Sequence, residues 1–189
     1  VGSKTSNGSE STGVIPFMKV VDAEMLAFSQ GVTRRGSYAA YLDMSHPEIE
    51  EFLDVRKPTG GDINRKSTNL HHGVVISDQF MALIESATRE EGFNDSWDLI
   101  DPNSGRVVKT VSAKTLWVKL IQNRVETGEP YIMFGDTVDE SLPEFQQKLG
   151  LKVHQSNLCS EITLPTDKDR TAVCCLSSVN LEEFDEWKD

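Results

Sequence analysis

The sequence predicts an α/β fold in a single domain, built on mostly parallel strands. Short apolar runs of strand length alternate with longer segments whose apolar residues recur at helical spacing. Turn-forming residues separate these segments, and no repeat or change of composition marks a domain boundary. Strands that alternate with helices are typical of a parallel sheet with helical crossovers. At 189 residues the chain is long enough to bury a core.

The N-terminal part is expected to be a loop followed by a helix. Residues 1–13 are mostly Gly, Ser, Thr and Asn, which favours a flexible loop. From about residue 20 to residue 30, Val21, Met25 and Phe28 recur on one face of a helix. The next residues, up to Ser37, hold two arginines between glycines and are expected to form a second loop.

The clearest helix is predicted from Ser112 to about Glu126, because its apolar residues keep helical spacing and Gly128 marks its end. Ser77 or Asp78 is a plausible N-cap for another helix. Further helices are predicted at 47–55, at 143–149 and from about residue 181. Strands are predicted at 38–42, 72–76, 131–134 and 172–176, with a loop or short hairpin over 90–105.

The charge and cysteine content limit the classes of function. A net charge of −11 argues against binding of polymeric nucleic acid, although it permits a nucleotide ligand. No apolar run approaches the roughly 18 residues of a membrane helix. The start at Val1, without Met or a signal peptide, suggests an excised or processed piece. Three cysteines without a secretion signal predict a reducing, cytoplasmic setting.

The residues most suggestive of chemistry are Asn157, Cys159 and Glu161. They alternate along a segment that is expected to be extended over 153–164, so their side chains should point to the same side. An amide, a thiol and a carboxyl that converge can orient a hydroxyl and move a proton. The alternative is a cysteine that only packs in a core, which is the commoner role of this residue and applies equally to Cys174.

Several segments resemble one enzyme family in the family's own order. Residues 156–162 (Ser-Asn-Leu-Cys-Ser-Glu-Ile) and 172–181 (Ala-Val-Cys-Cys-Leu-Ser-Ser-Val-Asn-Leu) resemble the active-site region of class I ribonucleotide reductase large subunits. Residues 11–17 and 29–36 look like the two effector-binding loops of this family, and 126–132 look like the turn before its active-site loop. Together these matches extend over nearly the whole chain.

The resemblance implies a role for each candidate residue. Cys159 would become a thiyl radical that abstracts the 3′-hydrogen of a ribonucleotide. Glu161 would act as the general base for the 3′-hydroxyl, and Asn157 would hold ribose hydroxyls. Cys174 would be one of two thiols that supply reducing equivalents. Cys175 stands at a position that the family does not use, so it is interpreted as a packing residue.

The resemblance also implies the surroundings of the site. The fold would be part of a ten-stranded α/β barrel over residues 1–189, with an active-site finger loop at about 153–164. The effector loops would lie at about 1–13 and 30–37, where Thr12, Gln30 and Arg34 are the candidate contacts for dNTP or ATP. Part of a barrel leaves sheet edges exposed, so the isolated chain is expected to be inactive alone.

The implied partners are a ribonucleoside diphosphate substrate, the remaining parts of the large subunit, a second copy in a homodimer, and a radical-generating small subunit. No cofactor is expected on this chain, because the diiron site and tyrosyl radical belong to the small subunit. Thioredoxin or glutaredoxin would be the reductant. An adenosylcobalamin-dependent relative would share the barrel and the thiyl step.

Two other functions remain open from the residues alone. Cys159 could be an ionised nucleophile paired with His154 in a different class of enzyme. The chain could also be a nucleotide-binding module without turnover, which would keep the effector loops and not need its cysteines.

Overall fold

A computed structural model describes residues 1–31 and 33–188 of the chain. Its centre is a three-stranded parallel sheet in the order β3-β4-β7, formed by Ala39–Asp43, His71–Ile76 and Tyr131–Phe134. All three strands were predicted from their apolar runs, and their bounds differ from the prediction by at most one residue at either end. The α/β class and the parallel pairing are therefore confirmed for this sheet.

Helices between the strands supply the crossovers that a parallel sheet needs. They are α2 (Ile49–Leu53), α3 (Asp78–Arg89) and α4 (Ala113–Thr127). The side chain of Ser77 caps α3 by accepting the N–H of Phe80, and the side chain of Ser112 caps α4 by accepting the N–H of Thr115. Gly128 ends α4 in the left-handed conformation, with φ of 77°, as its position predicted.

The first helix differs from its prediction. Helix α1 runs over Val14–Ala27, so it begins six residues before the predicted start. Its buried residues are Ile15, Met18 and Asp22, whereas Phe28 lies beyond the helix and is 65% exposed. The predicted apolar face was wrong because the helix packs its N-terminal half against the core and leaves its C-terminal end exposed.

Two antiparallel hairpins stand beside the parallel sheet. Strands β5 (Ser96–Ile100) and β6 (Val107–Ser112) form the hairpin expected near 90–105, which extends seven residues further than predicted. Strands β1 (Ser29–Gln30) and β2 (Arg34–Arg35) pair where the end of the first helix and a plain loop were predicted. Residues 1–13 form a loop that is closed by a bridge between Lys4 and Glu10.

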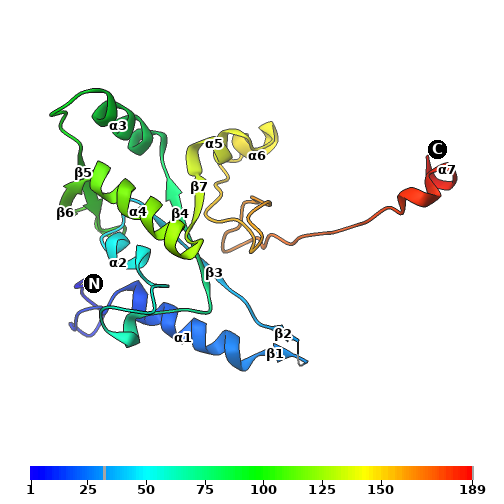
Figure 1. The fold of residues 1–189 in the computed structure, drawn as a ribbon, viewed down its shortest axis with the longest axis horizontal. Coiled ribbons are helices and arrows are strands. Elements are labelled where there is room, and N and C mark those ends of the chain that lie inside the picture. The colour runs from blue at the N-terminus through cyan, green and yellow to red at the C-terminus, as the bar shows by residue number, and fades with distance from the viewer. Residues whose placement is uncertain (32, 189) are drawn as a thin grey trace.

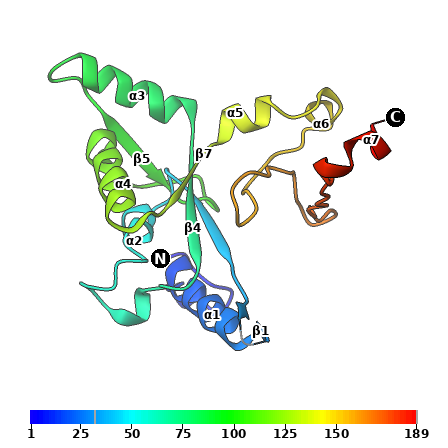
Figure 2. The same cartoon turned by 45° about the vertical axis from the view of Figure 1, so that its right-hand side comes forward.

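The two faces of the central sheet bury different clusters, because successive strand residues point to opposite sides. Ala40, Val74 and Ile76 join the main core, which includes residues of α1, α2, α3 and α4. Met133 belongs to a smaller cluster on the other face, together with Leu142 and Val153. Figures 1 and 2 show α2, α3 and α4 on one side of the sheet, with α5 (Gly135–Glu140) and the following chain on the other.

The C-terminal quarter departs most from prediction. No strand forms over residues 172–176, which lie exposed on a single extended segment that leaves the body (Figure 1). A strand needs a neighbour for its hydrogen bonds, and the described part of the chain offers none there. The predicted helix from residue 181 is a 3₁₀ turn (Leu181–Glu183) followed by α7 (Phe184–Trp187), while α6 (Glu144–Lys148) lies within its predicted range. Helix α5 was not predicted.

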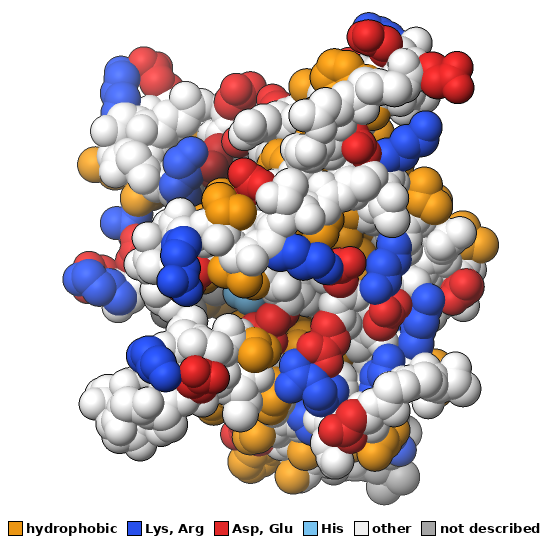
Figure 3. Space-filling view, turned by 90° about the vertical axis from the view of Figure 1, so that its left-hand side faces the viewer, with side chains coloured by type: hydrophobic (Ala, Val, Ile, Leu, Met, Phe, Trp, Pro, Cys, Tyr) orange, Lys and Arg blue, Asp and Glu red, His pale blue; other side chains and the backbone are white. Residues whose placement is uncertain are grey.

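Acidic and basic side chains are intermixed on the surface. Figure 3 shows Lys and Arg beside Asp and Glu over one face of the molecule. Ion pairs include Lys57 with Glu126, 3.2 Å apart, and Lys119 with Asp54, 2.7 Å apart. Of the helices that the structure describes, none has the length and apolar character needed to cross a membrane.

Candidate active site

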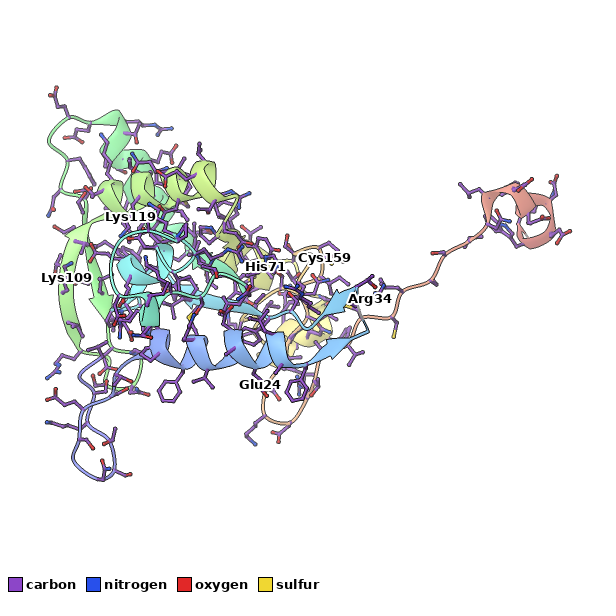
Figure 4. The ribbon with its side chains drawn as sticks, turned by 60° about the horizontal axis from the view of Figure 1, so that its bottom comes forward. Glu24, Arg34, His71, Lys109, Lys119 and Cys159 are labelled. Carbon is purple, nitrogen blue, oxygen red and sulfur yellow. The ribbon has the colours of Figure 1, made fainter. Side chains whose placement is uncertain are left out.

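The candidate site lies on residues 153–164, called the site segment below, on the sheet face opposite the main core. Val153 anchors its start by packing with Met133 and Leu142. The backbone N–H of Val153 also donates to Oδ1 of Asp139, 2.9 Å away. Figure 4 shows Cys159 outside the regular elements of the body. The segment is thus fixed at its start before it reaches the candidate residues.

Cys159 lies in a turn, and the predicted extended conformation is wrong there. The N–H of Ser160 donates to the carbonyl oxygen of Asn157 at 3.1 Å, and Ser160 has a left-handed φ of 64°. The N–H of Asn157 donates to the carbonyl of Ile162 at 3.0 Å. The Asn157 side chain accepts the N–H of Ile162 at 3.1 Å, which closes the loop. The alternation of side chains that an extended strand would produce therefore does not apply.

The structure brings two of the four candidate residues into contact. The Asn157 Nδ2 atom lies 3.9 Å from the Cys174 Sγ atom, across the gap between the site segment and the following extended chain. Both line a pocket of about 210 Å³ with Ile162 and Ala172. Cys159 and Glu161 are exposed and are not among the residues that line it. All three cysteines are free thiols at the surface.

Two tyrosines of the sheet hold the residues just before Cys159. The Tyr131 hydroxyl donates to the carbonyl oxygen of Leu158 at 2.9 Å. The Tyr41 hydroxyl lies 2.5 Å from Oγ of Ser156. Burial raises the pKa of Tyr131, and the negative charge of the Glu129 carboxylate raises it further. Burial is also the main cause of the raised pKa of Tyr41, so both phenols stay protonated near neutral pH.

A histidine-carboxylate cluster supports one of these tyrosines. The His71 ring stacks on Tyr131 with centroids 5.8 Å apart, and its Nδ1 contacts the buried Glu129 carboxylate. The backbone N–H of His72 donates to the same carboxylate at 3.2 Å. Burial alone would raise the pKa of Glu129, but hydrogen bonds from both histidines outweigh it and lower that pKa to about 2.

The chain is similar to proteins of one known family. The family model described as "Ribonucleotide reductase, barrel domain" matches residues 1–189. The chain belongs to this family. A large-subunit protein of ribonucleoside-diphosphate reductase from Frog virus 3 (isolate Goorha) is 54% identical, over 95% of this chain and 30% of that protein. The ribonucleoside-diphosphate reductase large subunit of Invertebrate iridescent virus 3 is 44% identical, over 94% of this chain and 36% of its own length.

A solved ribonucleotide reductase shares the fold. The alpha subunit of the class Id enzyme from Actinobacillus ureae matches with a TM-score of 0.70 and 32% sequence identity. The match covers 98% of this chain and 29% of that subunit. This chain therefore spans about a third of the length of these three reductase subunits. In its described residues the sheet is open, with β3 and β7 at the edges, so the barrel of the family is not closed here.

The candidate effector residues of this reductase chain lie at two ends of one helix. Thr12 is exposed just before α1, and Arg34 is exposed in β2, beyond the other end of α1. A helix of 14 residues is roughly 21 Å long, so the two positions do not meet within one copy. The side chain of Gln30 lies outside the described part of the chain. Figure 4 shows Arg34 near the tip of the β1–β2 hairpin.

Sequence reasoning missed the residues that support the turn of this reductase segment. Tyr41 and Tyr131 were predicted in strands without a function, and His71 and His72 were given no catalytic role. Glu129 was noted only as part of the turn at 126–132 that resembles the one before the family's active-site loop. The sequence held one usable signal for the two tyrosines. Both stand in short apolar runs that were predicted to be strands. The pairing of the strands was needed to show that their hydroxyls reach the same segment. Over the described residues, no group of three or more His, Cys, Asp or Glu is arranged to hold a metal ion.

Proposed function

We propose that this chain carries the thiyl-radical centre of a class I ribonucleoside-diphosphate reductase large subunit. The observation that carries the proposal is the contact between Asn157 and Cys174, which borders the turn that presents Cys159. These residue types, in a chain of the reductase family, are the ones that the reaction requires. The four candidate residues therefore keep the roles that the sequence suggested.

The reaction replaces the 2′-hydroxyl of a ribonucleoside diphosphate with hydrogen. The Cys159 thiyl takes the 3′-hydrogen, and Glu161 takes the 3′-hydroxyl proton as the 2′-oxygen leaves as water. Cys174 and a second thiol from the remaining parts of the large subunit together supply two electrons and two hydrogens, one to C2′ and one to the departing water, and end as a disulfide. Glu161 returns its proton to the 3′-oxygen, and Cys159 returns its hydrogen to C3′ and regains the radical. Thioredoxin or glutaredoxin would reduce the disulfide.

The radical itself comes from another subunit in this proposal. A partner with a diiron site and a tyrosyl radical would oxidise Cys159, as the resemblance to class I reductases implies. The exposure of Cys159 leaves that thiol accessible to the remaining parts of the large subunit. The open edges of β3 and β7 support completion of a ten-stranded barrel by those parts.

We further propose that dNTP or ATP effectors bind at residues 1–13 and 30–37, with Thr12, Gln30 and Arg34 as contacts. Because α1 separates Thr12 from Arg34, a complete effector site would combine loops from two copies of the subunit. This separation supports a homodimer of the complete large subunit.

Reconstitution tests the main proposal. The chain is co-produced with the remaining large-subunit parts and a radical-generating small subunit, and the formation of deoxyribonucleoside diphosphate is measured. We expect turnover that is lost in Cys159→Ser and retained in Cys175→Ser, because only the first thiol forms the radical. A folded assembly without turnover, or turnover that survives Cys159→Ser, would overturn the assignment.

The nucleophile hypothesis has less support. His154 and Cys159 are both exposed, and no hydrogen bond joins them among the described residues. A nucleophilic cysteine needs a base or positive charge that stabilises its thiolate. Rapid alkylation of Cys159 in the isolated chain, slowed by His154→Asn, would restore this alternative. A nucleotide-binding module without turnover would instead bind dNTP normally after all three cysteines are replaced.

A further inference from the structure

Three residues lie side by side across the central sheet beneath the site segment. In the strand register, Gly73 of β4 pairs with Tyr41 of β3 on one side and with Tyr131 of β7 on the other. Paired residues in a sheet point to the same face. Tyr41 packs against the small cluster of Met133, Leu142 and Val153, which marks this face as the one under the site segment.

Gly73 makes room for one of the tyrosine rings. A Cβ atom at this position would lie 2.4 Å from Cε1 and 2.6 Å from Cζ of Tyr41. These distances are far inside van der Waals contact, so the Tyr41 ring occupies the space of the missing side chain. The backbone of Gly73 does not require glycine, because its φ is not positive. Space for Tyr41 is therefore the reason that a glycine suits this position.

The two hydroxyls contact Ser156 and Leu158 directly, and Tyr41 is linked to Asn157 through Ser156. Tyr41 contacts Oγ of Ser156 at 2.5 Å, and that Oγ donates to the carbonyl oxygen of Asn157 at 2.9 Å. Tyr131 donates to the carbonyl oxygen of Leu158 at 2.9 Å. Ser156 is buried, while Leu158 and Cys159 are exposed. Little apolar packing is thus available to fix the turn, and the hydroxyl contacts are its main links to the sheet.

The ring of Tyr131 is packed against the ring of His71. His71 precedes Gly73 by two residues on β4, and its ring is nearly parallel to that of Tyr131, with an interplanar angle of 9°. The Nδ1 atom of the same His71 ring contacts the Glu129 carboxylate, which is 6% exposed. Each element of this arrangement is rigid, because strands carry both tyrosines and a buried carboxylate orients the stacking ring.

We propose that Tyr41 and Tyr131 are positioning residues that set the place of Cys159 over the sheet, with Gly73 as the gap that admits Tyr41. Reactive groups must be held close to productive geometry, and a displacement of about 1 Å can cost on the order of a hundredfold in rate. The hydroxyl contacts supply this constraint to an exposed turn. The inference rests on the proposed function for what Cys159 does, and on the structure for how Cys159 is held.

A spin label tests the positioning without turnover. Cys174 and Cys175 are replaced by serine, a nitroxide is attached to Cys159, and its electron paramagnetic resonance line shape is recorded for the full chain. Tyr41→Phe and Tyr131→Phe each remove only an oxygen, and both are expected to increase the mobile component of the spectrum. Gly73→Ala should have the same effect as Tyr41→Phe, because the added methyl displaces the ring from Ser156.

Tyr38→Phe is the matched control. Tyr38 stands just before β3, and its hydroxyl has no hydrogen bond among the described residues. The electron paramagnetic resonance spectrum of the Tyr38→Phe variant should equal that of the parent. Circular dichroism and the unfolding midpoint show whether each variant is folded. Unchanged spectra in both folded tyrosine variants, or the same change in Tyr38→Phe, would overturn the inference.

The reconstituted reductase gives a second readout. Tyr41→Phe and Tyr131→Phe should lower kcat by roughly tenfold or more and leave KM within about twofold, because substrate binding is kept while the thiol is misplaced. A parent without turnover would count against the proposed function and leave the spin-label result to decide the positioning. A parent with turnover, combined with unchanged kcat and unchanged spectra in the variants, would reject the positioning alone.

Discussion

The body of the molecule and its C-terminal quarter are stabilised in different ways. Phe52, Phe80 and Leu120 of the body are at most 1% exposed. Leu176 and Leu181 in the extended chain after the site segment are 85% and 76% exposed. The body therefore gains its stability from apolar burial, whereas the chain beyond Val153, which packs with Met133 and Leu142, depends mainly on polar contacts to the body. The residues proposed for chemistry lie almost entirely in the second region.

This contrast has a physical consequence for function. A reactive loop needs defined geometry, but it must also remain accessible to substrate and to partner groups. Hydrogen bonds from the strands can fix the geometry of the loop and still leave it accessible. The long apolar side chains beyond residue 172 leave surface uncovered that a larger assembly would bury. The predictions below test whether the two regions respond as differently as their contacts indicate.

The largest effect is expected in the main core. Phe80→Ala removes a fully buried ring that packs edge-on against Trp97, with centroids 5.0 Å apart. We expect a loss of about 3–5 kcal/mol in the free energy of unfolding, measured with urea. Leu176→Ala in the extended chain is the control, because that side chain is 85% exposed and should change the free energy by no more than about 0.5 kcal/mol. Equal effects would contradict the division into two regions.

A buried carboxylate on α1 should have the next largest effect. Asp22 accepts the backbone N–H groups of Asn69 at 3.0 Å and Leu70 at 2.7 Å. Asp22→Ala leaves both donors without a partner, so we expect about 2–4 kcal/mol of destabilisation in urea unfolding. Glu24→Ala on the same helix removes an exposed carboxylate and should be close to neutral. A near-neutral Asp22→Ala would show that water replaces the carboxylate.

Glu129 should make stability depend on acid pH. Its pKa of about 2 lies below the ordinary value of 4.5, so its ionised form stabilises the fold above pH 4.5. That stabilisation is lost as the pH falls from 4.5 through about 2. We expect the parent to exceed Glu129→Gln by ~2–3 kcal/mol at pH 6, with the difference shrinking toward pH 2. A difference that stays constant with pH in urea titrations would show that the two histidines do not stabilise the charge.

The smallest effect is expected where the site segment joins the body. Asp139→Ala removes the acceptor of the Val153 N–H and should cost about 1 kcal/mol, with faster proteolytic cleavage near residues 153–164. Lys152→Ala removes only the exposed partner of Asp139 and should leave the cleavage rate unchanged. Equal acceleration in both variants would assign the anchoring to the ion pair.

Local patterns predicted most of the body but not the site. The strand at 131–134 was predicted with its observed bounds, and Ser112 and Gly128 delimited α4 correctly, because caps and apolar runs act over a few residues. The strand at 172–176 was wrong, since a strand exists only where a neighbour pairs with it. The extended conformation at Cys159 was wrong because hydrogen bonds within 157–162 close a turn that periodicity does not show.

By itself the sequence determined the α/β class, the reductase family and the residue types proposed for the reaction. These depend on the order of residues along the chain. Only the tertiary structure decided that Tyr41, Gly73 and Tyr131 lie in one row, that the two hydroxyls meet the residues before Cys159, and that Asn157 reaches Cys174. These contacts join residues that are 17 to 115 positions apart. The row of Tyr41, Gly73 and Tyr131 exists because the strands pair in one register, and the contact of Asn157 with Cys174 exists because the chain folds back beside the site segment.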